Sequence, residues 1–449
     1  MANVIRLRKG LNINLKGRAS EQVSKAVVSG EYALVPDGFV GVTPKVVVHE
    51  GDYVKAGDAL FVNKHYPDVK FSSPVSGQVV AVERGERRKV LCVKVKAEDE
   101  QHYQSFDTLD VKAAEGSQVI DLLLKAGLFG YINQLPYAVS TNPTVMPKAI
   151  FVSALRDMPL AADFEVELKG NEEAFQTGLT ALSRIAKTYL GIGAKQQAAA
   201  LVNAKNVEVN VFDGPCPAGN VGVQVNHINP VNKGEVAWTV NPSAVIFFGR
   251  LFMTGKVDLT RTIAVAGSMV KEPSYVSTLV GTPLSVILDS KLTTNVHVRI
   301  INGNPLTGVK SSLNDFLSPC ASEVTVIPEG DNVYEILGWI MPRFGQFSTS
   351  KSYFSWLCKG KEYDLDARIK GGERHMIMSG EYDKVLPMDI YAEYLIKAII
   401  TGDIDRQEQL GIYEISPEDF AVAEFVDSSK LELQRIVRDG LNVLRKENA

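Results

Sequence analysis

Closely spaced glycine turns dominate the segment from Lys45 to Lys96, and they restrict it to short strands. Runs of β-branched and aromatic residues lie between the turns, as expected for the strands of a small sheet. The expected strands are Val46–Val48, Ala59–Val62, Gln78–Val82 and Val90–Val95. We therefore predict a small all-β unit here, followed by an acidic linker at about residues 97–116.

Two stretches of this unit resemble the halves of a biotinyl or lipoyl carrier fold, a barrel-sandwich hybrid. They are EGDYVKAGDALF, from Glu50 to Phe61, and SSPVSGQVVAV, from Ser72 to Val82. Such carriers hold their cofactor on a lysine at the tip of the joining hairpin, where this chain has Tyr66 or Pro67. We therefore expect a structural barrel-sandwich hybrid over residues 1–100, without lipoate or biotin. The alternative, a swinging-arm carrier, lacks its attachment lysine.

A Rossmann-like α/β domain is predicted over residues 110–255, where helical and extended patterns alternate. Buried strands are expected at Ala149–Ala154 and Val207–Phe212, and a helix at Glu172–Leu190. Gly191-Ile192-Gly193 looks like the start of a dinucleotide fingerprint, but it follows the expected helix and Gln196 stands at the third glycine position. A glycine cap at the end of that helix is the better interpretation.

The candidate ligand loop is FDGPCPAGNVG, which follows the expected strand Val207–Phe212. Its glycines Gly214, Gly219 and Gly222 leave room for a ligand to approach the backbone, and open α/β sheets bind ligands at such strand ends. Asn220 and Val221 stand where a nucleotide-hydrolysing loop needs Lys and Ser or Thr, so that activity is excluded. The alternative is a rigid Pro-Gly turn without a ligand.

The remaining chain is predicted to form a β-rich domain over residues 256–330 and a helical domain over residues 331–449. Expected strands of the former are Thr262–Ala266, Ser285–Leu288 and Val296–Ile301, and expected helices of the latter are Asp389–Thr401 and Ser429–Lys446. Aromatic residues are frequent at the start of the helical domain and are expected to pack in a core, although they could face a quinone or a partner. They are Trp339, Phe344, Phe347, Tyr353, Phe354 and Trp356.

Charge and polarity exclude several classes of protein. With a net charge of -4, the chain lacks the excess of basic residues that is typical of a nucleic-acid binder. The best apolar run, Ala244–Met253, is short and contains Arg250, so we expect no membrane span and no sodium pathway within this chain. The basic cluster Arg84–Lys89 is interpreted as a solvated hairpin tip, with docking on anionic lipid or a partner as the alternative.

Cysteine and histidine positions predict no metal or redox centre. The four cysteines, Cys92, Cys216, Cys320 and Cys358, are too far apart in sequence for a metal or redox motif. The six histidines form no pair at the spacing that places two ligands on one helical face. We expect a chain without metal ligands that works in a reducing compartment.

Segments spread over most of the chain are similar to the A subunit of sodium-translocating NADH:quinone reductases. They are AIFVSALRDMPLAADFEV from Ala149, EAFQTGLTAL from Glu173, GPCPAGNVG from Gly214, INPV from Ile228 and IAVAGSMVKEP from Ile263. The resemblance implies a peripheral subunit on the cytoplasmic face of a bacterial inner membrane, docked on a membrane-embedded subunit of the complex. It also implies that the chain supports quinone reduction coupled to sodium export, by assembly and shaping of the quinone region.

The same resemblance implies kinship in fold with the flavin- and NADH-binding subunit of complex I. It includes a β-grasp domain of the SLBB type, to which GTPLSVIL from Gly281 and NVHVRIINGNPLTG from Asn295 correspond. The chain departs from the family pattern at Cys216, at Val223–Asn226 and around Tyr131–Tyr137, where typical His or Arg residues are missing. No catalytic residue is therefore carried over.

The C subunit of the Rnf electron-transport complex resembles this layout but adds a cysteine-rich iron–sulfur region. The matching stretch, Ile415–Leu444, contains no cysteine, so we expect a ferredoxin-like helical scaffold without clusters. The leading hypothesis is a subunit without a tightly bound cofactor, with quinone as a candidate ligand, that is not catalytic alone. The alternative is a stand-alone or Rnf-C-like electron-transfer subunit that carries a noncovalent flavin.

Overall fold

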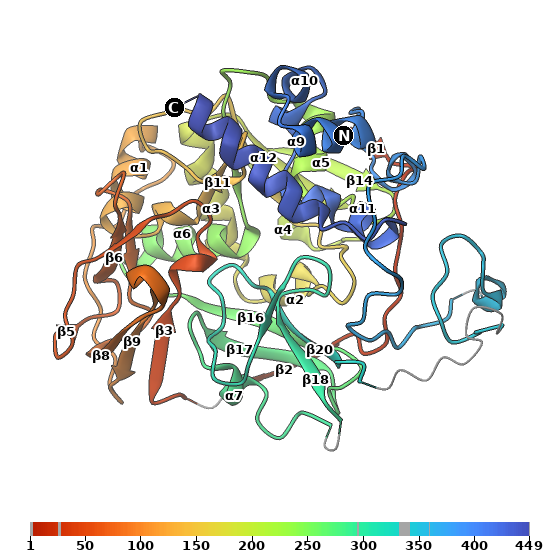
Figure 1. Ribbon diagram of the computed structural model, residues 1–449. Coiled ribbons are helices and arrows are strands. Elements are labelled where there is room, and N and C mark those ends of the chain that lie inside the picture. The colour runs from red at the N-terminus through yellow and green to blue at the C-terminus, as the bar shows by residue number, and fades with distance from the viewer. Residues whose placement is uncertain (1–2, 26–27, 294–295, 332–341, 359, 449) are drawn as a thin grey trace.

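A seven-stranded, mostly parallel sheet forms the central layer of the computed structural model (Figure 1), which describes residues 3–25, 28–293, 296–331, 342–358 and 360–448. The sheet has the order β1-β14-β13-β12-β15-β10-β11, with β10 and β11 antiparallel to their neighbours. The bounds of its strands are Asn3–Arg6, Glu208–Asp213, Thr188–Gly193, Ala149–Ser153, Ala237–Val240, Ile132–Leu135 and Val139–Ser140, in that order. The expected strands Ala149–Ala154 and Val207–Phe212 are thus confirmed as β12 and β14.

Helices cover both faces of this sheet, as parallel strands require. Ile150 and Val152 of β12 pack in the core shared with α1 (Gly116–Lys125), α3 (Glu172–Ile185) and α6 (Pro242–Thr254). Ala149 and Phe151 alternate with them and face a second core, which includes Val225 of α5 (Val221–Ile228). Two short helices, α2 (Phe164–Leu168) and α4 (Ala199–Val202), complete the connections.

Glycines allow α3 and α6 to cross at close range. A Cβ atom on Gly178 of α3 would lie 2.1 Å from the carbonyl oxygen of Val245, and one on Gly249 of α6 would lie 1.7 Å from that of Ala174. Real side chains do not reach such distances, so any larger residue would force the two helices apart. This crossing holds the start of α6 beneath the strand ends of the sheet.

Two predictions around residue 190 are wrong. The helix expected to reach Leu190 ends at Ile185, and Thr188–Gly193 forms β13 between β12 and β14. Gly191 and Gly193 therefore end a strand and do not cap a helix. Apolar residues at helical spacing fit either element here, and pairing on both edges decides for the strand.

The barrel-sandwich hybrid lies beside the α/β core, at the left of Figure 1. It consists of a four-stranded sheet, β3-β9-β8-β5, and a three-stranded sheet, β4-β6-β7. The strands are Glu31–Leu34, Val90–Ala97, Gly77–Arg84, Tyr53–Val54, Pro44–Val46, Ala59–Asn63 and Lys70–Ser72, in the same order. Phe61 and Phe71 stack between the sheets with ring centroids 4.7 Å apart. Arg84–Lys89 forms the exposed β8–β9 turn, as predicted, except that Gly85 is half-buried.

The first strands of the chain join other sheets. β1 pairs in parallel with β14 of the central sheet, and β2 (Ser20–Lys25) pairs in parallel with β17 of the second large sheet. Both lie within the range 1–100 that was predicted for the barrel-sandwich hybrid. The predicted domain boundaries otherwise remain predictions.

A six-stranded mixed sheet with the order β19-β18-β20-β16-β17-β2 forms the β-grasp-like domain at the bottom of Figure 1. Its other strands are Val309–Ser311, Val298–Asn302, Glu323–Pro328, Thr260–Ala266 and Ser274–Leu279. The prediction of a strand at Ser285–Leu288 is wrong, because Leu284–Ile287 forms the helix α7. Leu284 and Ile287 point into the core of this domain, and so short a run can bury its apolar residues as a helix or as a strand.

Helices form most of the C-terminal part. They are α8 (Tyr382–Val385), α9 (Ala392–Thr401), α10 (Ile404–Gln409), α11 (Ala421–Val426), α12 (Leu433–Glu447) and the short 3-10 helices η4 (Phe354–Leu357), η5 (Ile412–Glu414) and η6 (Pro417–Phe420). Of these, α9, α10 and α12 lie at the top of Figure 1. The two predicted helices correspond to α9 and α12. No helix in the described ranges combines the length and apolarity needed to cross a bilayer.

The expectation that the aromatic stretch packs in a core is wrong for most of its members. Phe347 packs on Tyr363 and Phe425, but Phe344, Phe354 and Trp356 are each about half exposed. Trp339 lies outside the described residues. The exposed rings belong to a segment that extends away from the rest of the protein (Figure 1).

Candidate functional site

A cleft of about 530 Å³ opens where the carboxyl ends of β12 and β15 meet the β-grasp-like domain and the C-terminal helices. Open α/β sheets bind ligands at this position. Its walls come from the turn after β12, the first turn of α6, the loop before α5, the β18–β20 region and η6. Distant parts of the sequence therefore build one site.

The candidate loop reaches this cleft with only one of its three glycines. Gly219 lines the cleft together with Asn220 and Val221. Gly214 packs against the first strand, where an added Cβ would lie 2.7 Å from Cβ of Leu7. Gly222 packs against the carboxyl group of Asp419, which an added Cβ would approach to 2.2 Å. Close packing within the protein thus explains why glycine stands at positions 214 and 222, without a role in ligand binding.

The backbone of Gly219 is already hydrogen bonded within the protein. Its N–H donates to Oδ2 of Asp157 at 2.9 Å, and its carbonyl oxygen accepts from Oγ of Ser153 at 2.7 Å. An added Cβ would lie 2.6 Å from the carbonyl oxygen of Leu155, so glycine is needed for this contact. The loop can shape the cleft floor, but the N–H of Gly219 already donates its hydrogen bond to Asp157.

Asp157 lies at the end of the turn after β12. Burial raises its pKa to about 6, against the opposing effect of the backbone N–H donors. Burial also raises the pKa of the neighbouring Cys216 thiol, whose Sγ lies 3.6 Å from Sδ of Met158. The thiol is therefore held in its neutral form.

A buried ion-pair network lies beneath the cleft. Arg156 donates from both Nη atoms to Oε2 of Glu167 at 3.0 Å, and Ser243 donates to the same oxygen at 2.8 Å. Nη2 of Arg261 donates to Oγ of Ser243 at 3.2 Å, and its Nη1 donates to the carbonyl oxygen of Pro319 at 2.9 Å. Burial lowers the pKa of Arg261, and the charge of Glu167 opposes this effect. Such a network is rigid because a movement of one side chain would leave the buried charge of another without its partner.

Three buried polar atoms around the cleft have no hydrogen-bond partner among the described residues: the hydroxyl of Tyr131, Oδ1 of Asp157 and Nε of Arg261. Nε of Arg261 does lie 3.9 Å from Oε1 of Glu167, as an ion pair. Burial raises the pKa of Tyr131, so its hydroxyl keeps its proton and remains a donor. Buried polar groups are normally paired, so atoms of this kind mark places where a ligand or water can bind.

The C-terminal wall carries a second pair of carboxyl groups. Glu418 is exposed to solvent, but dehydration on its protein-facing side, with the charge of Asp419, raises its pKa to about 7. Burial raises the pKa of Asp419 to about 6, while Ser416 and Asn220 donate hydrogen bonds to it and lower it. Nδ2 of Asn220 lies 2.9 Å from the carbonyl oxygen of Glu418 and 3.3 Å from Oδ1 of Asp419. Asn220 thus joins the candidate loop to η6.

Arg438 of α12 closes the cleft on the side of the barrel-sandwich hybrid. Its Nη1 donates to the carbonyl oxygen of Tyr137 at 2.8 Å, and its Nη2 donates to that of Ala138 at 3.1 Å. A side chain from the C-terminal helix therefore holds the backbone of the β10–β11 turn.

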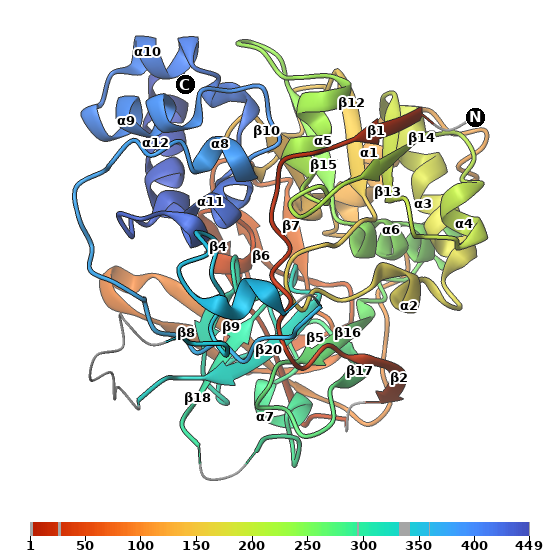
Figure 2. The same ribbon diagram turned by 90° about the vertical axis from the view of Figure 1, so that its right-hand side faces the viewer.

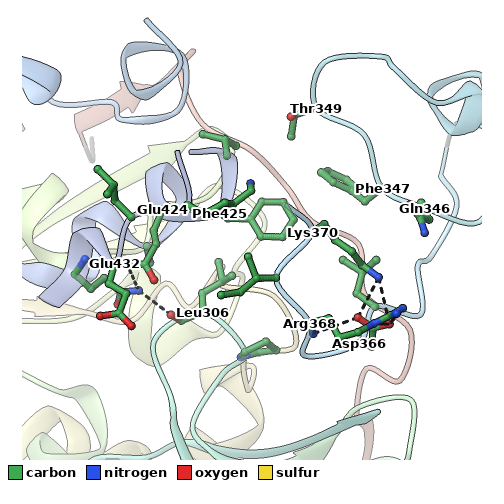
Figure 3. Close-up of a pocket in the computed structure, with 18 of the residues that line it drawn as sticks. Leu306, Gln346, Phe347, Thr349, Asp366, Arg368, Lys370, Glu424, Phe425 and Glu432 are labelled. Carbon is green, nitrogen blue, oxygen red and sulfur yellow. Dashed lines mark hydrogen bonds and ion pairs between the residues drawn. The ribbon is translucent and has the colours of Figure 1, made fainter. Parts of the chain in front are cut away.

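A second cavity, of about 460 Å³, lies between the C-terminal helices and residues 345–370 (Figure 3). Leu306, Phe347 and Phe425 supply apolar walls, and Asp366 and Lys370 add charged groups to the lining. Within the described ranges, no three His, Cys, Asp or Glu side chains gather as metal ligands at either cavity or elsewhere.

Sequence reasoning missed Tyr131, Arg261, Glu418 and Arg438. These residues come from four separate segments, and no local sequence pattern indicates that they belong to a site. Arg156 and Asp157 did carry a signal, since they follow a predicted buried strand at its carboxyl end. The lipoyl-like hairpin tip also packs back on the α/β core, where Nδ2 of Asn142 donates to the hydroxyl of Tyr66 at 3.1 Å.

Known families match the chain domain by domain. The model described as the N-terminal barrel-sandwich hybrid domain of NqrA matches residues 5–98. The model of the second alpha/beta domain of NqrA matches residues 114–257, and that of the NQRA C-terminal domain, of the SLBB type, matches residues 262–312. The fold is therefore multidomain α+β with a barrel-sandwich hybrid, an α/β core and a β-grasp-like domain, as predicted.

Curated relatives match over the full length. The A subunit of the Na(+)-translocating NADH-quinone reductase from Neisseria meningitidis serogroup A is 33% identical, over 99% of this chain and 100% of the relative. The proteins of the same name from Yersinia pestis bv. Antiqua and Vibrio vulnificus are 33% and 32% identical over the same shares. The chain belongs to this family, the A subunits of the Na(+)-translocating NADH-quinone reductases.

Solved structures give a looser likeness. Two structures of an NAD+-reducing NiFe hydrogenase superimpose with TM-scores of 0.35 and 0.40, at 14% and 12% identity. They cover 49% and 74% of this chain and 50% and 61% of the hydrogenase chains. Values this low support no inference about the site.

The raised pKa of Asp157 predicts how stability depends on pH. Between about pH 4 and 6 the folded protein retains a proton that the unfolded chain has released, so the Asp157 contribution to stability falls as pH rises through this window. Asp157→Asn should remove this fall and raise the free energy of unfolding at neutral pH by about 1–2 kcal/mol. Urea denaturation across this pH range measures both effects.

The matched control is Asp213→Asn, at an exposed position at the end of β14. It should leave the pH profile unchanged. If Asp157→Asn is less stable than the wild type at neutral pH, the ionised carboxylate stabilises the loop and the predicted sign is incorrect.

Proposed function

We propose that this chain works as a peripheral subunit of the Na+-translocating NADH:quinone reductase complex and that its cleft contributes to the quinone region. In this proposal it docks on a membrane-embedded subunit on the cytoplasmic face of the inner membrane. It supports quinone reduction coupled to sodium export by assembly and by shaping the quinone site. Membership of the family supports the proposed role as a subunit of the complex. The chemistry of the cleft supports its proposed contribution to the quinone region.

The unpaired donors around the cleft are the observation that most favours a quinone. A quinone ring is flat and apolar and has two carbonyl oxygens that accept hydrogen bonds. The Tyr131 hydroxyl and Arg261 Nε are buried donors without a hydrogen-bond partner in the described structure. Both lie just beneath the cleft surface, so a small side-chain movement would let a carbonyl oxygen satisfy them. Phe247, Leu155 and Met158 add the apolar wall that such a ring needs.

The carboxyl groups of the cleft are suited to supply the protons that quinone reduction consumes. Reduction of a quinone to a quinol takes up two electrons and two protons, and the electrons come from NADH through the complex. Glu418 and Asp157, with pKa values raised to about 7 and about 6, hold protons closer to neutral pH than ordinary carboxyl groups do. Groups with such values exchange protons readily at working pH.

We further propose that the isolated chain carries no tightly bound cofactor: no flavin, no iron–sulfur cluster, no lipoate and no biotin. The stretch that aligns with the cluster region of the Rnf subunit lacks cysteine, and Tyr66 and Pro67 stand where a carrier lysine would. A stoichiometric flavin band in the visible spectrum of the purified chain would favour the alternative, an electron-transfer subunit with a noncovalent flavin.

Tyr131→Phe tests the quinone site directly. It removes the hydroxyl but keeps the ring that packs on Phe247, with centroids 5.8 Å apart. Loss of one hydrogen bond should weaken binding of a quinone headgroup analogue about three- to tenfold, with little change in stability. The control is Tyr382→Phe, a buried tyrosine among the C-terminal helices. Equal affinities in both variants, measured by calorimetry, would remove Tyr131 from the proposed site.

Gly219 and Gly214 provide a matched pair for the candidate loop. Alanine at either position would lie within 2.7 Å of neighbouring atoms, so both variants should lose about 1–3 kcal/mol of stability. Only Gly219→Ala should also reduce quinone-analogue binding and the quinone reductase activity of the assembled complex, because only Gly219 lines the cleft. Unchanged binding and activity in Gly219→Ala would reject the loop as part of the site and leave assembly as the role of the chain.

A further inference from the structure

The segment 342–361, here called the basic-aromatic arm, has an unusual composition. Its sequence, PRFGQFSTSKSYFSWLCKGK, contains four basic residues and no acidic one, in a chain whose net charge is -4. It also contains five aromatic residues: Phe344, Phe347, Tyr353, Phe354 and Trp356. Acidic residues return only at Glu362, where the arm rejoins the protein.

Three of the five aromatic side chains of the arm are exposed. Phe344 is 48% exposed, Phe354 is 52% and Trp356 is 48%, and in the described part of the chain all exposed phenylalanines and tryptophans belong to this arm. Leu357 adds a further exposed apolar side chain. Large apolar side chains gathered on the surface mark an interaction site.

The arm is anchored at its base and extends away from the rest of the protein. In Figure 1 it is the cyan-blue loop at the right, and in Figure 2 it faces the viewer. The N–H of Tyr363 donates to the carbonyl oxygen of Asn14 at 2.8 Å, and the N–H of Lys16 donates to that of Tyr363 at 2.9 Å. Phe347 packs on Tyr363 with ring centroids 5.2 Å apart. Lys16 and Arg18 are exposed beside this base and extend the basic surface.

Cations and rings of the arm lie next to each other. Nζ of Lys351 is 5.5 Å from the ring centroid of Trp356, and the guanidinium of Arg343 is 5.5 Å from that of Tyr353. Each pair presents an apolar ring with a positive charge beside it. Lipid headgroup regions attract this combination, because the rings enter the interface while the charges meet anionic lipids.

We propose that the basic-aromatic arm docks on an anionic phospholipid surface. The cores of protein interfaces also favour aromatic residues, but they are depleted in lysine and serine, and the arm has three lysines and four serines, so a protein partner fits less well. Headgroups bind through charge of one sign without precise geometry, which suits a segment that is rich in small residues and whose charged residues are all basic. This contact is independent of the proposed quinone cleft, which lies elsewhere in the fold.

Vesicle binding by the full chain tests the proposal. We expect the wild type to co-sediment with vesicles of phosphatidylcholine and phosphatidylglycerol, and not with phosphatidylcholine alone. Binding should fall as salt is raised, since salt screens the charges. The arm variant combines Lys351→Glu, Phe354→Ser and Trp356→Ser. It should bind at least about tenfold more weakly, because each basic residue near an anionic surface contributes about fivefold and the rings add to this.

A control variant replaces the same kinds of residue, exposed aromatic rings and a lysine, at α9. Tyr391 and Tyr394 are 70% and 58% exposed, and Lys397 is exposed on the same helix. Tyr391→Ser, Tyr394→Ser and Lys397→Glu together should leave vesicle binding unchanged. Thermal unfolding checks that both variants fold, and a blue shift of wild-type tryptophan emission with anionic vesicles gives a readout that needs no variant.

Several outcomes would overturn the proposal. They are no binding of the wild type to anionic vesicles, equal binding to neutral vesicles, or equal loss in both variants. If the wild type ignores vesicles and the arm variant fails to assemble with the membrane-embedded subunits, the arm is a protein-docking surface. Quinone-analogue affinity should be the same in the arm variant and the wild type, so failure here is distinguishable from failure of the quinone site.

Discussion

The buried network of Arg156, Glu167, Ser243 and Arg261 is the interaction on which the arrangement of the protein most depends. It joins the turn after β12, the short helix α2, the first turn of α6 and strand β16 of the second large sheet. Removing one partner from such a network leaves an uncompensated buried charge, at a cost of about 3–5 kcal/mol. The α/β core and the β-grasp-like domain are therefore fixed against each other, and the cleft opens above their junction.

Further contacts make the cleft a composite of separate domains. Asn220 of the candidate loop binds η6, and Arg438 of α12 binds the backbone of the β10–β11 turn. A ligand in the cleft would touch the α/β core, the β-grasp-like domain and the C-terminal helices at once. Such a site depends on how the domains are held together, which suits the quinone-shaping role that we propose.

Local pattern predicted elements well where residue spacing allows a single conformation. The glycine turns predicted β6, β8 and β9 of the barrel-sandwich hybrid, and the long amphipathic pattern before Lys446 predicted α12. It failed where short apolar runs fit two conformations, at Thr188–Gly193 and Leu284–Ile287. Pairing with β12 and β14 decided the first case, and burial in the core of the six-stranded sheet decided the second. Such partners are remote in sequence, and a local pattern cannot contain them.

The sequence by itself determined the family, the order of the domains, the loss of the carrier lysine and a glycine loop at a strand end. Each of these depends on residues that are adjacent in the chain. Only the tertiary structure decided which glycine reaches the cleft, and that Tyr131, Arg261 and Glu418 surround it. It also decided that Phe344, Phe354 and Trp356 are exposed. These properties depend on burial and on unpaired polar atoms, which arise only when distant segments pack together and exclude water from some side chains but not from others.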